Sequence, residues 1–108
     1  MVLAVSAGLG WAVPPAHADP VTYVNSVNAR PGFNFPSGDA AIAYGRGVCD
    51  KIAVGRSYAQ IIGDIKVEVT HGDESLANYL AGQVVNELCT ELIGPLRDSA
   101  ANYRPGAQ

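Results

Sequence analysis

Residues 38–57 read GDAAIAYGRGVCDKIAVGRS, and this stretch decides the class of fold. Along it an apolar or small residue recurs every three or four positions, which is the spacing of one face of an α-helix. This stripe consists of Ala41, Tyr44 or Gly45, Val48 and Ile52. We predict a helix near 39–54, capped by Ser37 or Asp39, ended by Gly55, and carrying Cys49 beside the stripe.

The same spacing predicts helices on either side of this stretch. Each of these helices has a recognisable start. The helix that begins near residue 57 starts with a capping box formed by Ser57 and Gln60. The predicted ranges are 20–29, 57–69 and 73–93, with a short helical turn over 96–103. Residues 65–69 also alternate as a strand would, but a lone strand would lack a partner. We therefore predict an all-α domain over 19–103, a bundle of about four helices, the longest ended by Gly94 and Pro95.

Two local features lie within this predicted bundle. Gly45 and Gly47 are costly inside a helix, so we expect them to permit close approach of another helix. The connection 30–38 carries both phenylalanines of the chain, Phe33 and Phe35. We expect these rings to fold back as a lid on the core, and the alternative is an exposed binding site.

Residues 1–18, MVLAVSAGLGWAVPPAHA, predict a signal peptide rather than part of the domain. The apolar run is too short to span a membrane, and Ala16 and Ala18 form a small-x-small cleavage site before Asp19. The alternatives are an uncleaved anchor or a helix packed on the core. No Lys or Arg precedes Arg30, so we expect the true translation start to lie upstream. The mature chain would be secreted, periplasmic or in the cell envelope, with a disordered tail over 104–108.

Charge and cysteine content exclude several classes of protein. The net charge of −3 disfavours a nucleic-acid scaffold or a polybasic membrane binder, and two cysteines cannot form a structural zinc site alone. In an exported chain, an even count predicts one disulfide, Cys49–Cys89, between the second and fourth helices. The alternative is a redox-active pair, which usually has two residues between its cysteines.

The spacing of these residues is similar to that of a known family. The segments that carry the resemblance are 38–42 (GDAAI), Gly45, 48–50 (VCD), 55–57 (GRS), Ala81, Val84-Val85 and Leu88-Cys89. They resemble the DUF732 family of small exported actinobacterial proteins, abundant in mycobacteria. The resemblance covers about 19–90 and implies an all-helical domain with a Cys49–Cys89 bridge, but no established activity. Many members end after the second cysteine with a proline, whereas this chain continues to Gln108.

The reactive side chains in the sequence do not form a recognisable catalytic site. His71 lies near Asp73 and Glu74, but a metal site needs three or four ligands on a fixed frame, so we expect no metal and no cofactor. Ser37, Ser57 and Ser75 fall at predicted helix starts, where capping explains them. The carboxylate pairs Asp64/Glu68 and Glu87/Glu91 are typical of solvated helix faces. We therefore predict that the chain is not an enzyme.

The tyrosines are the most informative of the remaining residues. Tyr44, Tyr58 and Tyr79 fall at or near the apolar faces of three predicted helices. Buried tyrosines usually belong to the core, and the sharper interpretation is a ligand cavity lined by their rings. We predict a non-enzymatic binding or interaction module whose partner is an unknown protein or small ligand. The alternative is a carrier of a small apolar ligand, or of haem bound by a Tyr or His71.

Overall fold

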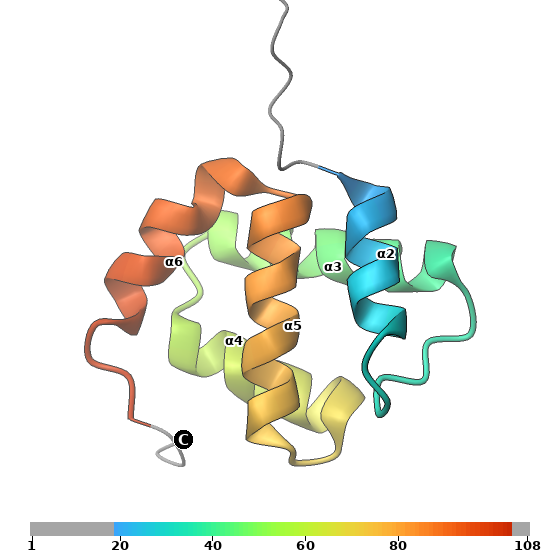
Figure 1. The fold of residues 1–108 in the computed structure, drawn as a ribbon. Helices are drawn as coiled ribbons and strands as arrows, with labels where there is room; N and C mark the ends of the chain where they lie inside the picture. Colours follow the sequence, from blue (N-terminus) through green and yellow to red (C-terminus); the bar gives the residue numbers. More distant parts are fainter. Residues whose placement is uncertain (1–18, 105–108) are drawn as a thin grey trace, which may run out of the picture.

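Helix α5 (Glu74–Glu87) stands at the centre of the fold, in a computed structural model that describes residues 19–104. The helices around it are α2 (Pro20–Asn28), α3 (Gly38–Ala53), α4 (Tyr58–Ile65) and α6 (Ile93–Ala100). The all-α prediction is confirmed (Figure 1). The expected cleavage residues Ala16 and Ala18, and the expected tail from residue 105 on, lie outside the described residues.

Helices α2, α3 and α4 begin close to the predicted positions because side-chain oxygens satisfy amides of their first turns. Asp19 and Ser37 each accept a hydrogen bond from an amide two or three residues further on, at 2.9 and 3.0 Å. At α4, Ser57 and Gln60 form the predicted capping box. Gly55, with φ of 100°, follows the end of α3 in a conformation that favours glycine.

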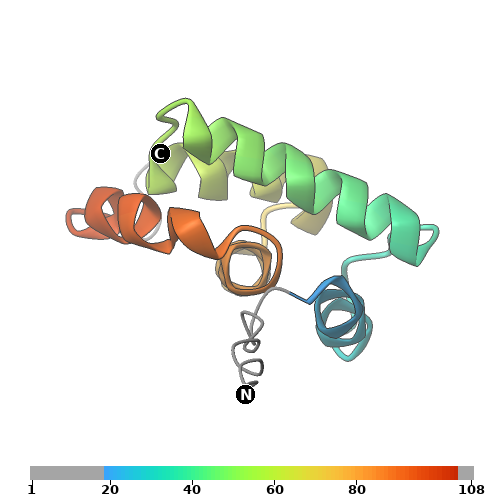
Figure 2. The same cartoon turned by 90° about the horizontal axis from the view of Figure 1, so that it is seen from above.

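Helix α3 crosses behind α2 and α5, which both views show (Figures 1 and 2). Seen from above, α2 and α5 are viewed nearly end-on, and α6 lies on the other side of α5 from α2 (Figure 2). Helix α5 therefore contacts α2, α3 and α4, and its buried face supplies much of the core. No helix within 19–104 is both long and apolar enough to cross the bilayer.

The core is closed by close packing of α3 against α2 and the end of α5. The largest fully buried side chains are Tyr23, Ile61, Ile62, Ile65, Leu80 and Val84. A Cβ at Gly45 would lie 2.5 Å from Leu88 Cδ1 and 2.9 Å from the Tyr23 hydroxyl, so a larger residue would force these side chains to shift. The expected close approach is confirmed at Gly45. It is wrong at Gly47, where no atom of residues 19–104 beyond the adjacent turns of α3 itself lies within 4 Å of the corresponding Cβ position.

The predicted disulfide is confirmed, but its second cysteine lies outside a helix. Cys49 in α3 bonds Cys89, with 6.2 Å between the Cα atoms. Helix α5 ends at Glu87 rather than at residue 93, and Cys89 has φ of −151° and ψ of 68°. The bridge therefore joins α3 to the segment after α5. Here the approach to α3 takes precedence over helical propensity, which would have continued α5.

Gly94 and Pro95 lie in the first turn of α6 instead of ending α5. A short 3-10 helix, Thr90–Leu92, separates the two helices. Proline is tolerated in a first turn because an amide there has no partner within the helix. The predicted helical turn over 96–103 is therefore the second part of a helix that begins at Ile93.

The last turn of the predicted third helix widens into a π-helix, Lys66–Thr70. It ends at His71, whose φ of 53° places a non-glycine residue in the left-handed region. The Gly72 amide then donates to the Lys66 carbonyl at 2.9 Å. The structure thus retains the predicted helix over this segment in a different form, and the strand alternative is wrong.

Candidate functional site

The three tyrosines predicted to line a cavity hydrogen-bond to different partners. Tyr44 donates to Glu68 at 2.7 Å, and Tyr79 donates to the Ser26 carbonyl at 3.3 Å. Tyr58 donates to the side chain of Asn78, on α5. The structure therefore does not bring the three hydroxyls together at one point.

Two of these tyrosines are connected by the loop between α2 and α3. The ring of Phe35 lies 5.7 Å from that of Tyr44, and the ring of Phe33 lies 6.2 Å from that of Tyr79, measured between centroids. Phe33 is buried and Phe35 packs against the core, so the expected lid is confirmed. The guanidinium carbon of Arg30 lies 3.9 Å from the centre of the Tyr79 ring, at the end of this aromatic row.

Tyr58 lies on the opposite flank of α5, against the C-terminal segment. Its ring meets that of Tyr103 edge to face at 4.9 Å, and its amide donates to Ser99 Oγ at 2.9 Å. Tyr58 also lines an open depression of about 350 Å³ beside Val85 and Leu96. Of the three predicted residues, Tyr58 therefore lies beside such a depression.

Burial and carboxylate neighbours raise the pKa values of several tyrosine hydroxyls, namely those of Tyr23, Tyr44 and Tyr58. Burial raises the pKa of Tyr23 to about 12. It also raises the pKa of Tyr44, with a further increase from the hydrogen bond to Glu68. The pKa of Tyr58 is raised by burial and by the negative charge of Glu74. These hydroxyls therefore remain protonated near neutral pH and act as hydrogen-bond donors.

Of the pair Asp64/Glu68, Glu68 is exposed as predicted, whereas Asp64 is partly buried. Asp64 is only 18% exposed and accepts two hydrogen bonds from Arg56, at 2.6 and 2.7 Å. Lys51 lies 3.3 Å from Asp64 and 3.7 Å from Glu68. The hydrogen bond from Arg56 is the main reason why the pKa of Asp64 lies below its usual range. The cluster ties α3 to α4, a structural use that the i, i+4 spacing alone did not reveal.

Of the acidic residues beside His71, Asp73 caps a helix and Glu74 pairs with Lys66. Asp73 Oδ1 accepts the Leu76 amide at 3.0 Å, and the Thr70 hydroxyl donates to the Asp73 carbonyl at 2.8 Å. Asp73 is therefore the cap of α5, and Thr70 closes the turn before it. Within 19–104, no three His, Cys, Asp or Glu residues are grouped closely enough to hold a metal ion.

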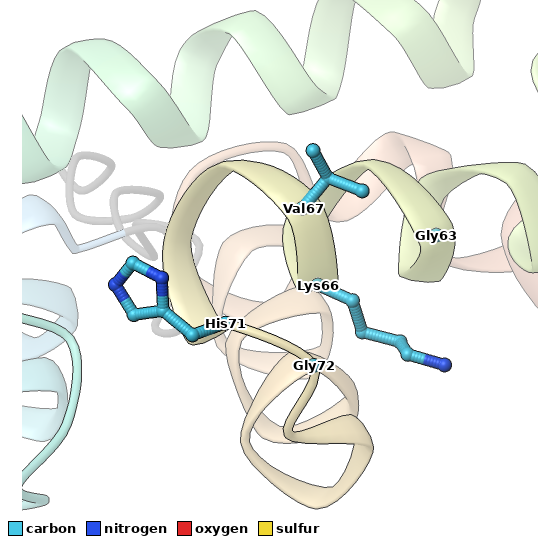
Figure 3. A pocket seen from close by; sticks show the side chains of 5 residues that line it. All are labelled: Gly63, Lys66, Val67, His71 and Gly72. Carbon is cyan, nitrogen blue, oxygen red and sulfur yellow. The ribbon is translucent and has the colours of Figure 1, made fainter.

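An open, mainly apolar depression of about 520 Å³ lies on the outer side of the π-helix (Figure 3). We call it the π-helix surface, and it is lined by Gly63, Lys66, Val67, His71 and Gly72. Val67 is 81% exposed although it is a large apolar residue. The side chains of Lys66 and His71 extend in opposite directions from this segment (Figure 3). This surface could not be predicted from the sequence, because Val67 belongs to no apolar stripe at helical spacing and a π-helix has no simple sequence pattern.

The chain matches one known protein family over most of its length. The model of a protein family of unknown function, DUF732, matches residues 18–91. The chain belongs to the DUF732 family. The match includes both bridged cysteines and ends before α6, as the sequence resemblance implied. Comparison with curated proteins and with solved structures finds no match. A disulfide in a DUF732 domain is consistent with a location outside the cytoplasm.

Proposed function

We propose that this DUF732 protein is a non-enzymatic binding module that acts outside the cytoplasm and contacts a protein partner through the π-helix surface. The observation that carries this proposal is the exposure of Val67, at 81%, within a mainly apolar depression. The backbone conformation around Val67 supports the same conclusion. π-Helical turns and left-handed non-glycine residues cost free energy and are found preferentially at functional sites. Here Lys66–Thr70 and His71 combine both features.

The polar residues support binding rather than catalysis. The hydroxyls of Tyr44 and Tyr58 have raised pKa values and donate to side chains of the protein itself. The carboxylate of Asp64 is held by Arg56 and Lys51. Groups engaged in this way stabilise the fold and orient neighbouring helices. An exported domain closed by a disulfide is a rigid support for a contact surface.

A second candidate function is that of a carrier for a small apolar ligand. The volume of about 520 Å³ lies in the range of small-molecule pockets, roughly 300–1,000 Å³. Such pockets enclose most of their ligand, however, whereas Val67 on this surface is largely open to solvent. Haem would in addition need an axial ligand such as His71. The openness of the surface favours a protein partner over a carried molecule.

Photo-crosslinking tests the proposed contact. A photoreactive amino acid replaces Val67 in the full chain, produced in a host that exports it. The matched control replaces Val54, which is 84% exposed at the end of α3 and does not line the π-helix surface. We expect a covalent protein adduct at position 67 and little at 54. Equal adducts at both positions, or none at 67, would contradict the proposal, and a mass increase of a few hundred daltons would favour the carrier.

Intact-mass measurement of the exported protein tests the location. We expect a chain that begins at Asp19 and is two hydrogens lighter than its reduced form. Recovery from the cytoplasm alone, with residues 1–18 retained and two free thiols, would contradict an extracytoplasmic protein.

A further inference from the structure

A second, polar depression lies in the loop between α2 and α3, away from the π-helix surface. Its volume is about 260 Å³, and polar atoms make up most of its lining. We call it the Arg30 loop, and its lining residues within the loop are Arg30–Phe35. Val27 and Asn28, at the end of α2, complete the lining. None of its lining residues is acidic.

The guanidinium of Arg30 is held in place but is not neutralised. It stacks on Tyr79 at 3.9 Å, and the Tyr79 hydroxyl is itself fixed by its bond to the Ser26 carbonyl. Stacking engages the face of a guanidinium and leaves the N–H groups at its edge available. Among the described residues, no carboxylate lies within ion-pair distance of Arg30. Arg56, by contrast, is paired with Asp64.

The backbone of the same loop supplies further donors. The φ angles of Gly32 and Asn34 are 114° and 58°, on either side of Phe33. Left-handed residues of this kind occur in the concave backbone arrangements whose successive amides bind anions. The amides of residues 32–35 donate to no acceptor within 19–104. A Cβ at Gly32 would lie 2.7 Å from Leu76 Cδ1, so the loop backbone at this position lies against α5.

We propose that the Arg30 loop binds an oxyanion, a carboxylate or a phosphate group, through the Arg30 guanidinium and the loop amides. A planar guanidinium forms two parallel hydrogen bonds with either group, and backbone amides add to them. The chain as a whole carries a net charge of −3, so general attraction of anions does not favour binding. Any binding must come from the local donors. The inference is independent of the proposed function at the π-helix surface.

Titrations followed by the amide resonances of the folded, oxidised protein test this site. One arm uses inorganic phosphate. The other uses an acetylated dipeptide with a free C-terminal carboxylate, with its C-terminal amide as the uncharged control. We expect saturable shifts at residues 32–35 with at least one of the two anions and none with the amide. Saturation by phosphate alone identifies a phosphate group as the ligand, and saturation by the dipeptide alone identifies a chain terminus.

Matched arginine variants then locate the binding. R30Q removes the charge and the paired donors, and R46Q removes an exposed arginine from α3. We expect R30Q to weaken binding about tenfold or more, since charge-assisted hydrogen bonds are lost, and R46Q to leave it unchanged. Both variants replace exposed side chains, so the spectra should retain the folded pattern. Absence of saturable shifts in the wild type, or equal weakening by R46Q, would overturn the proposal.

Discussion

Helices α3 and α6 both pack against α4, but they are attached by different kinds of interaction. Helix α3 is held by a covalent bond, Cys49–Cys89, and by the ion pair of Lys51 with Asp64. Helix α6 buries one large side chain, Leu96, and Ser99 accepts a hydrogen bond from the Tyr58 amide. The family match ends at residue 91, so the weakly attached helix is also the part beyond the shared domain.

This difference predicts unequal local stability. A helix held by few apolar contacts and exposed hydrogen bonds opens at a lower free energy than one linked covalently to the core. We therefore expect the amides of α6 to exchange hydrogen faster than those of α3. Variants that each remove one attachment test this difference in stability.

The largest effect is expected from the double variant C49A/C89A. The disulfide closes a loop with a sequence separation of 40, for which chain entropy gives about 4 kcal/mol of stabilisation. Urea unfolding followed by circular dichroism should show this loss, and reduction of the wild type should reproduce it. An unchanged free energy of unfolding would show that packing alone holds α3.

Leu96→Ala should cost about 2–3 kcal/mol, because Leu96 is 6% exposed and its removal leaves a cavity between α6 and the bundle. Hydrogen exchange should show the loss mainly in α6. Arg97→Ala, at the exposed neighbouring position, is the control and should change stability by less than about 0.5 kcal/mol. If protection from hydrogen exchange fell equally in α3 and α6, the two helices would not be attached independently of each other.

Asp64→Asn should cost about 1 kcal/mol at pH 7, a value reduced for screening by solvent. The pKa of Asp64 is lowered in the folded protein, chiefly by the Arg56 hydrogen bonds. A lowered pKa stabilises the folded state above the ordinary value of 3.8 and ceases to do so as the pH falls through the folded value. The difference between the two proteins should therefore begin to shrink below about pH 4 and disappear only below the lowered pKa of the folded protein. A difference that is constant with pH would mean that the carboxylate charge is not involved.

The smallest effect is expected from Tyr103→Phe. The Tyr103 hydroxyl donates to Glu74 at 2.5 Å, and loss of one partly exposed hydrogen bond costs about 0.5 kcal/mol. Burial and Glu74 raise the pKa of Tyr103 to about 12, so absorbance titration of the tyrosines should lose one component near pH 12 in this variant and keep that of Tyr23. An unchanged titration would show that Tyr103 does not hold this bond in solution.

The features predicted correctly from the sequence are those set by neighbouring residues. Asp19, Ser37 and Ser57 cap helices because a short side chain reaches an amide two or three positions away. Gly45 was recognisable because glycine is costly inside a helix unless something packs against it. The disulfide followed from the expected export and the count of cysteines.

The features predicted wrongly depend on contacts between distant residues. Nothing next to Glu87 ends α5, and the end follows from the need to bring Cys89 to α3. Gly94 and Pro95 can end or begin a helix, and only the path of the chain decides. The aromatic row could not be predicted, because it depends on how the loop between α2 and α3 folds back on α5. The stacked Arg30 was missed for the same reason.

The bond between Cys49 and Cys89 has one more consequence, for the way the chain responds to proteolysis. Residues 49–89 form a closed ring, which contains α4, the π-helix and α5. A single cut at the exposed turn of His71 and Gly72 would open the ring without separating its halves. A cut in the Arg30 loop, or after Cys89, would instead release α2 or α6. A single cut can therefore separate either terminal helix from the chain, whereas residues 49–89 stay covalently connected after one cut.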